Sequence, residues 1–306
     1  MKKITLLFTA TAMILQPFVT YAENEQSFSE TINGSIFSYT IDKNMNVTIT
    51  GCSSESEEII IPSSLRGHMV TSIGDKAFFS NIFFSSVVIP EGITSIGNNA
   101  FSGCLSLKNV EIPESVISIG KECFASCTSL ESVKLNNSIL SVPERCFSSC
   151  TSLNQITITD SVVFIGTEAF FGCADISGII VPPTVNIIGE NAFGMHYNVR
   201  NNSIEKINNF RIRGIPETSA EMYAEDTGIE LYCKLGDVNS DGFVDAVDAT
   251  FVLSEYASVS TGMPVSFNNY QHFVADYNKD DFVDAVDATF ILTEYARLQT
   301  TSPDEL

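Results

Sequence analysis

The sequence has no tryptophan, only three histidines, and far fewer basic residues than acidic ones. Lys and Arg number 16 against 37 Asp and Glu, so the formal net charge is −21. This balance argues against nucleic acid or an anionic membrane surface as a partner, because both are bound by clustered bases. Without tryptophan the chain lacks the best platform for stacking sugar rings, although 22 Phe and 9 Tyr remain. A hydrophobic content of 44% is enough to bury a core.

The first 22 residues have the pattern of a secretory signal peptide. Lys2 and Lys3 precede an apolar run over 4–15, and Thr20-Tyr21-Ala22 supplies small residues where cleavage is expected. The run is too short to cross ~30 Å of hydrocarbon comfortably, and no later segment is long and apolar enough to span a membrane. We therefore expect a signal peptide over 1–22, an exported protein and no membrane span.

The middle of the chain repeats every 23 residues. One phenylalanine marks each unit without a slip: Phe78, Phe101, Phe124, Phe147, Phe170 and Phe193. A unit of this length holds a short strand, a turn and a short helical turn, and it cannot bury its apolar side alone. Stacked units align identical columns, so each Phe is expected to pack between its neighbours, with Val110 and Ile112 inward and Glu111 outward. The period predicts an α/β solenoid of about six units.

The repeated segment Ile96-Gly97-Asn98-Asn99-Ala100-Phe101-Ser102-Gly103-Cys104, followed by Leu107 and Ile112-Pro113, resembles the BspA-type leucine-rich repeat. The resemblance covers about 59–200. It implies an N-terminal hairpin or cap over 23–58, with a turn at 42–46, and a closing segment over 201–232 with a short helix. Gly97 and its equivalents are expected to supply a backbone conformation that side chains resist. The first unit carries five extra residues before Phe78, a candidate for a functional insertion.

Eight cysteines allow two interpretations. Four share one column, three residues after a Phe: Cys104, Cys127, Cys150 and Cys173. Cys123 and Cys146 directly precede a Phe, where other units have Ala77 and Ala100. Spacings such as Cys123 to Cys127 are compatible with a metal site or a disulfide. The alanines at the equivalent positions favour a ladder of small buried side chains.

Two twelve-residue segments near the C-terminus, 237–248 and 276–287, have the pattern of calcium-binding loops. Oxygen ligands at positions 1, 3, 5, 7, 9 and 12 of such a loop surround a hard cation. Those positions are Asp237, Asn239, Asp241, Phe243 (through its carbonyl), Asp245 (through water) and Asp248, and then Asp276, Asn278, Asp280, Phe282, Asp284 and Asp287. Four carboxylates per loop repel one another, so calcium is expected to fold this region as well as bind to it. The pattern predicts two Ca²⁺ ions.

Each loop is followed by a near-identical helical pattern, over 249–257 and 288–296, and no helical pattern precedes either loop. Loop plus following helix, duplicated, resembles the type I dockerin domain of cellulosomal proteins over about 235–298, and we assign 233–306 to a small all-α calcium-binding dockerin domain. Asp281 stands where Gly is expected, and Asp tolerates a left-handed backbone better than most residues. The resemblance implies calcium-dependent docking into a cohesin module of a scaffold protein. The positions it carries over as cohesin contacts are Ala246, Val247, Leu253 and Ser254, with Ala285, Val286, Leu292 and Thr293.

No catalytic pattern accompanies these parts. The outward strand column reads Val88, Glu111, Lys134, Thr157 and Ile180, without the facing carboxylates of a glycosidase. The sequence therefore predicts a secreted, non-catalytic cellulosome component, extracellular or held at the cell surface through a scaffold. Its repeats are expected to recognise a protein or a plant cell-wall polysaccharide. The whole protein is expected to take part in the degradation of plant polysaccharide. The alternative is a cellulosomal hydrolase, acting on polysaccharide or protein, whose active site is not recognisable.

Overall fold

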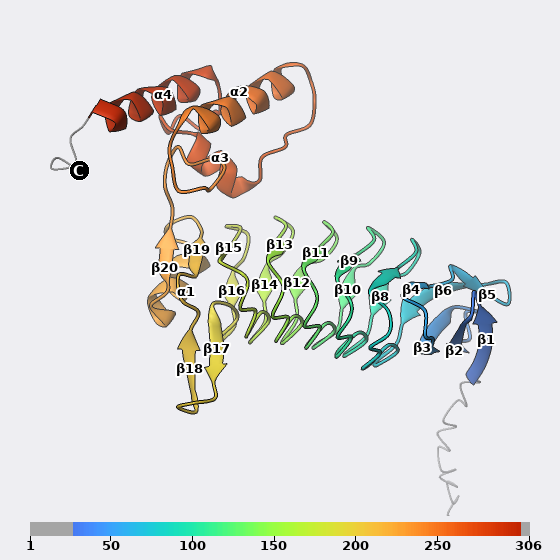
Figure 1. Ribbon diagram of the computed structural model, residues 1–306. Coiled ribbons are helices and arrows are strands. Elements are labelled where there is room, and N and C mark those ends of the chain that lie inside the picture. Colours follow the sequence, from blue (N-terminus) through green and yellow to red (C-terminus); the bar gives the residue numbers. More distant parts are fainter. Residues whose placement is uncertain (1–26, 301–306) are drawn as a thin grey trace, which may run out of the picture.

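The computed structural model describes residues 27–300, so the expected signal peptide lies outside the described residues. Short strands wind into an elongated solenoid, and a helical domain lies beside its C-terminal end (Figure 1). The solenoid begins with three longer strands, β1 (Ser27–Ile32), β2 (Ser35–Ile41) and β3 (Val47–Ser53), paired antiparallel in that order. The turn between β2 and β3 is the one expected at 42–46, where Asp42 Oδ1 accepts hydrogen bonds from the Asn44 and Asn46 N–H groups.

The solenoid makes about eight turns. One parallel sheet contains β4 (Glu58–Ile60), β7 (Ser86–Val88), β9 (Asn109–Glu111), β11 (Ser132–Lys134) and β13 (Gln155–Thr157), and a second continues along the coil with β15 (Gly178–Ile180), β19 (Arg211–Arg213) and β20 (Glu230–Tyr232). Another side of the coil carries β6 (His68–Ile73), β8 (Ser95–Ile96), β10 (Ser118–Ile119), β12 (Ser141–Val142), β14 (Phe164–Ile165) and β16 (Ile187–Ile188). Strands 23 residues apart pair in register, as at Val133 and Val110.

The remaining elements fill the two ends of the coil. The antiparallel pair β17 (Met195–Asn198) and β18 (Ser203–Lys206) and the helix α1 (Ser219–Thr227) lie in the closing segment, and α1 is the helix expected there. The five-residue insertion forms β5 (Ser64–Leu65), which turns back onto β6. Its Arg66 guanidinium lies 4.5 Å from the centre of the Phe28 ring. The insertion therefore packs on the N-terminal cap.

The phenylalanine column forms a stack through the core. Ring centres of Phe101 and Phe124 lie 5.3 Å apart, those of Phe124 and Phe147 5.5 Å apart, and both pairs are within 3° of parallel. Phe193 is the last residue of the column, and its ring centre lies 4.5 Å from that of Tyr223 in α1. Val110 and Ile112 are buried and Glu111 is exposed, as expected.

The glycine column has a different cause from the one expected. Gly97, Gly120, Gly166 and Gly189 do not have positive φ angles. A Cβ built on Gly120 would lie 2.4 Å from the backbone nitrogen of Asn98 in the preceding turn. The column is therefore kept small by the close approach of neighbouring turns, and the expectation of a special backbone conformation was wrong. Pro143 occupies the same column in one turn, so the contact can shift locally.

The cysteines are part of the packing. All eight are unpaired, and the six in the repeats are buried. The Sγ of Cys127 lies 3.1 Å from the carbonyl oxygen of Phe101, and the same contact recurs at Cys104, Cys150 and Cys173. Burial raises the pKa of the Cys173 thiol to about 12, although hydrogen bonding to the Cys150 backbone opposes the shift. A raised pKa leaves little reactive thiolate at neutral pH.

We expect thiol titration of the native protein at about pH 8 to label only Cys52 and Cys233 at a measurable rate. These two are half-buried, and burial raises the pKa of Cys52 to about 11, so even they should react slowly. The other six should react only after unfolding in guanidinium, giving a total of eight. A total of four or fewer without reductant would mean at least two disulfides and would contradict the packing role.

The C-terminal domain consists of α2 (Ala246–Ser260), α3 (Asn269–Ala275) and α4 (Ala285–Thr300). Buried Ala249, Val252, Ala288 and Ile291 join α2 and α4 in a separate core. The short α3 directly precedes the second loop, which corrects the expectation that neither loop follows a helix. Asn268 and Gln271 form a capping box at its start, so seven residues suffice for a helix. Among residues 27–300, no helix combines the length and apolar character needed to cross a membrane.

Candidate metal centre and docking face

Both candidate loops curl around the carboxylate at position 1. Asp237 is fully buried, and its two oxygens accept hydrogen bonds from the N–H groups of Asp241 (3.1 Å) and Gly242 (3.0 Å). In the second loop the Asp276 carboxylate accepts hydrogen bonds from Asp280 (3.1 Å) and Asp281 (3.0 Å). The two loops therefore share the same turn at positions 1 to 6.

The last ligand position closes each loop in the same way. Asp248 is fully buried, and it accepts hydrogen bonds from the N–H groups of Val238 (2.8 Å) and Asp245 (2.9 Å). Asp287, equally buried, accepts them from Tyr277 (2.8 Å) and Asp284 (3.0 Å). Asp245 is position 9 of the first loop, and its hydrogen bond to Asp248 is one of the two that form the capping box at the start of α2. Each helix therefore starts inside its loop, three residues earlier than the pattern predicted.

The tight curl requires left-handed backbone at positions 4 and 6. Ser240 and Gly242 have φ angles of 60° and 97°, and Lys279 and Asp281 have 62° and 67°. Asp281 thus takes the conformation expected of the glycine that it replaces, at some cost because it has a Cβ.

The side chains present suit a hard divalent cation. Each loop offers carboxylate, amide and main-chain carbonyl oxygens, the ligands that Ca²⁺ prefers. Burial raises the pKa of Asp248, although hydrogen bonds from the backbone of Asp245, Asn239 and Val238 act in the opposite direction. Asp237 and Asp248 of the first loop are both fully buried, and two buried carboxylates in one loop favour a bound cation. Within 27–300, however, no three His, Cys, Asp or Glu side chains converge as a ready-made metal site.

The predicted docking residues are exposed in both halves of the domain. All eight are exposed, on α2 and α4 or at their first residues: Ala246, Val247, Leu253 and Ser254, with Ala285, Val286, Leu292 and Thr293. Val247 and Val286 are each 49% exposed, and Leu253 and Leu292 are 43% and 42% exposed. The two halves therefore present closely matched apolar surfaces, which we call the docking face.

Glu255 has a role that the sequence did not reveal. Its buried carboxylate accepts hydrogen bonds from the N–H groups of Ser266 (2.9 Å) and Phe267 (3.2 Å), which fixes the connector between the halves. Burial alone would raise the pKa of Glu255, but hydrogen bonds from the side chain and backbone of Ser266 and the backbone of Phe267 lower it below its ordinary value. The equivalent Glu294 instead pairs with Arg297 at 2.8 Å. Identical residues at equivalent positions gave no sign of this difference.

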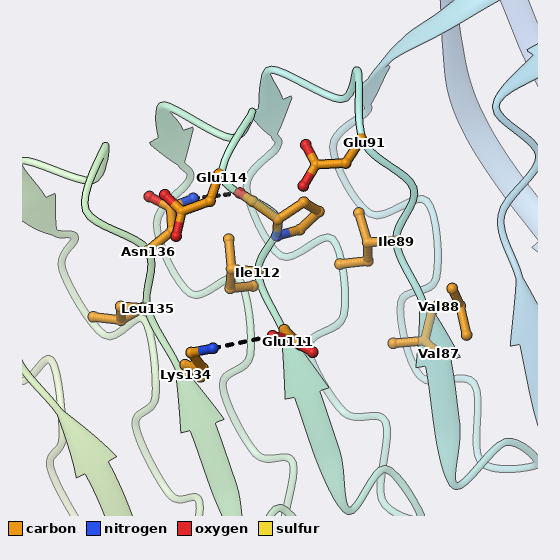
Figure 2. Close-up of a pocket in the computed structure, with 11 residues that line it drawn as sticks. Val87, Val88, Ile89, Glu91, Glu111, Ile112, Glu114, Lys134, Leu135 and Asn136 are labelled. Carbon is orange, nitrogen blue, oxygen red and sulfur yellow. Dashed lines mark hydrogen bonds and ion pairs between the residues drawn. The ribbon is translucent and has the colours of Figure 1, made fainter. Parts of the chain in front are cut away.

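The repeat region carries a groove of ≈ 460 Å³ on its exposed sheet (Figure 2). Figure 2 shows Glu91 and Glu114 at one end of the groove and Glu111 paired with Lys134 at the other, 3.3 Å apart. The Glu91 carboxylate accepts a hydrogen bond from the Ser115 N–H at 3.3 Å. Glu111 of the outward strand column is thus paired with the lysine of the next turn.

Known families match both parts of the chain. Residues 71–200 match the family described as BspA type Leucine rich repeat region, in six copies, and residues 235–294 match the Dockerin type I domain. No curated protein matches the chain.

Solved structures of bacterial leucine-rich repeat proteins are similar to parts of the chain. A leucine-rich repeat protein from T. pallidum is 21% identical to this chain, with a TM-score of 0.49. The match covers 64% of this chain and 95% of the T. pallidum chain. A leucine-rich repeat protein from Eubacterium ventriosum is 20% identical to this chain, with a TM-score of 0.42. The match covers 51% of this chain and 49% of the Eubacterium ventriosum chain.

The chain therefore combines a BspA-type leucine-rich repeat solenoid with a type I dockerin domain. Type I dockerin domains bind calcium, and their partner is a cohesin module. The pair of domains indicates an extracellular, cellulosome-associated component with repeats for protein interaction. Both are non-catalytic kinds of domain.

Proposed function

We propose that this protein is a secreted, non-catalytic cellulosome component. Its dockerin domain binds a scaffold cohesin in a calcium-dependent way, and its solenoid recognises a protein or a plant cell-wall polysaccharide during polysaccharide degradation. The observation that carries the proposal is the duplicated loop and helix, whose two halves expose the same apolar residues at the same positions.

Two calcium ions are held by the two loops. Their ligands are Asp237, Asn239, Asp241, Phe243, Asp245 and Asp248, and Asp276, Asn278, Asp280, Phe282, Asp284 and Asp287. The shared hydrogen bonds and left-handed positions of the loops support this assignment, as does their all-oxygen donor set. Calcium lowers the mutual repulsion of the carboxylates, so the ions stabilise the domain as well as the docking face.

Cohesin binds the docking face through either half, in two orientations related by a half-turn. The equal exposure of Val247 and Val286 supports this, because a partner that fits one half meets the same surface on the other. The contact is apolar at its centre.

These assignments give each segment of the chain a role. Residues 1–22 direct export, 23–58 cap the solenoid, 59–200 form the repeats, 201–232 close them and 233–306 form the dockerin. The strand bounds and the separate helical core support the division. The groove on the exposed sheet is the place where the repeats present an extended surface to a ligand.

Calcium-dependent capture tests the proposed function. We expect the full chain to bind immobilised type I cohesin modules in millimolar calcium and to be released by a chelator, because folded loops position the docking face. The variant Asp237→Ala/Asp276→Ala should fail to bind at any calcium concentration. Binding that persists in chelator, or its absence from every type I cohesin tried, would contradict the proposal. Hydrolysis of plant polysaccharide by the pure chain would contradict its non-catalytic part.

A further inference from the structure

The closing strands of the solenoid touch the dockerin domain directly. Ile180 and Ile215 pack against the dockerin core, in which Tyr270 is fully buried. Asp160, from a loop of the repeats, accepts a hydrogen bond from the Asn269 N–H at the start of α3, at 3.3 Å. Figure 1 shows the helical domain seated beside the strands at this end of the coil. The two domains therefore share an interface that orders one against the other.

Two polar contacts of this interface reach the first calcium loop. The Tyr232 hydroxyl, at the end of β20, donates a hydrogen bond to Oδ2 of Asp237 at 2.5 Å. Arg213, at the end of β19, donates from Nη2 to the carbonyl oxygen of Ser240 at 3.1 Å. Asp237 is position 1 of the loop, and Ser240 is its left-handed position 4. Residues of the solenoid thus hold a carboxylate that we assign as a ligand and the left-handed residue at position 4 of the loop.

The second loop lacks these contacts. Among residues 27–300, the Asp276 carboxylate accepts hydrogen bonds only from its own loop, from Asp280 and Asp281. The two loops have nearly the same ligands and the same turns, so the attachment to the solenoid is the main difference between their surroundings.

We propose that Tyr232 and Arg213 are positioning residues that couple the first calcium loop to the folded end of the solenoid. This inference rests on the proposed calcium binding. A hydroxyl that orients a ligand carboxylate strengthens metal binding without touching the metal. The coupling is reciprocal, so calcium in the first loop stabilises β19 and β20 to the same extent that these strands favour calcium.

Calcium titration of full-length variants by calorimetry tests the coupling. With the second loop disabled by Asp276→Ala/Asp280→Ala, Tyr232→Phe should weaken calcium binding ~10-fold, at the lower end of the effect of outer-shell partners. With the first loop disabled by Asp241→Ala/Asp245→Ala, the same change should have no measurable effect. Tyr256→Phe is the matched control, because Tyr256 is exposed on α2 and belongs to neither loop segment, 237–248 or 276–287.

Hydrogen exchange provides a second readout that needs no disabled loop. Calcium added to the wild-type chain should slow exchange of the Arg211–Arg213 and Glu230–Tyr232 amides, and Tyr232→Phe/Arg213→Met should abolish this slowing while calcium still protects 276–287. Equal effects of Tyr232→Phe on both loops, no effect on either, or calcium protection confined to 237–300 in the wild type would overturn the coupling alone. Absence of calcium binding to the wild-type chain would overturn the proposed function with it.

Discussion

Replacing Val247 and Val286 together by aspartate should lower the affinity for cohesin at least ~100-fold, because an unpaired carboxylate in an apolar contact costs about 3 kcal/mol or more. Either replacement alone should cost only about a factor of two. One charged half still leaves the other half free to face the partner, and the complex loses one of two equivalent orientations. Calorimetric titration with a cohesin module in saturating calcium measures both effects.

The double variant needs a control of equal charge. Val163→Asp/Val199→Asp places the same two charges on exposed valines of the solenoid and should leave cohesin affinity unchanged. Calcium content and far-ultraviolet circular dichroism should match the wild type in both double variants, since none of the four valines is buried. A single variant that abolished binding would show that only one half meets cohesin and would refute the two-orientation proposal.

The sequence predicted the features that repeat. An unbroken 23-residue spacing fixes which side chains share a column, so the phenylalanine stack and the inward Val110 followed from counting alone. The closing helix and the turn at 42–46 carried local signals, Ser-Ala-Glu-x-Tyr-Ala in one case and Asp-to-Asn in the other. The dockerin match followed from duplication of a ligand pattern that few sequences satisfy by chance.

The features that failed or were missed depend on neighbours distant in sequence. A glycine required by close approach of an adjacent turn cannot be told from one required by its own φ, and Gly120 is of the first kind. Helix α3 spans only seven residues, and it depends on a capping box and on the burial of Tyr270 rather than on a long amphipathic pattern. The contact between Tyr232 and Asp237 joins residues only five positions apart, but it forms because β20 ends at the interface between the domains.

The phenylalanine stack should dominate the stability of the solenoid. We expect Phe124→Ala to lower the free energy of unfolding by about 4 kcal/mol, the usual cost of emptying a buried aromatic site. Phe124 has no exposed surface, and its ring lies between those of Phe101 and Phe147 at 5.3 and 5.5 Å. The cavity removes both stacking contacts and weakens the interfaces of one unit with the units on either side, on which a solenoid depends.

Urea unfolding followed by circular dichroism, in saturating calcium, measures this loss without relying on tryptophan fluorescence. Phe79→Ala is the matched control, since Phe79 directly follows Phe78 of the stack in sequence but is 50% exposed, and it should cost less than about 1 kcal/mol. Because neighbouring units are coupled, Phe124→Ala should also lower the midpoint of the whole solenoid rather than split the transition. A loss no larger than that of Phe79→Ala would mean that the aligned strands, and not the aromatic column, hold the turns together.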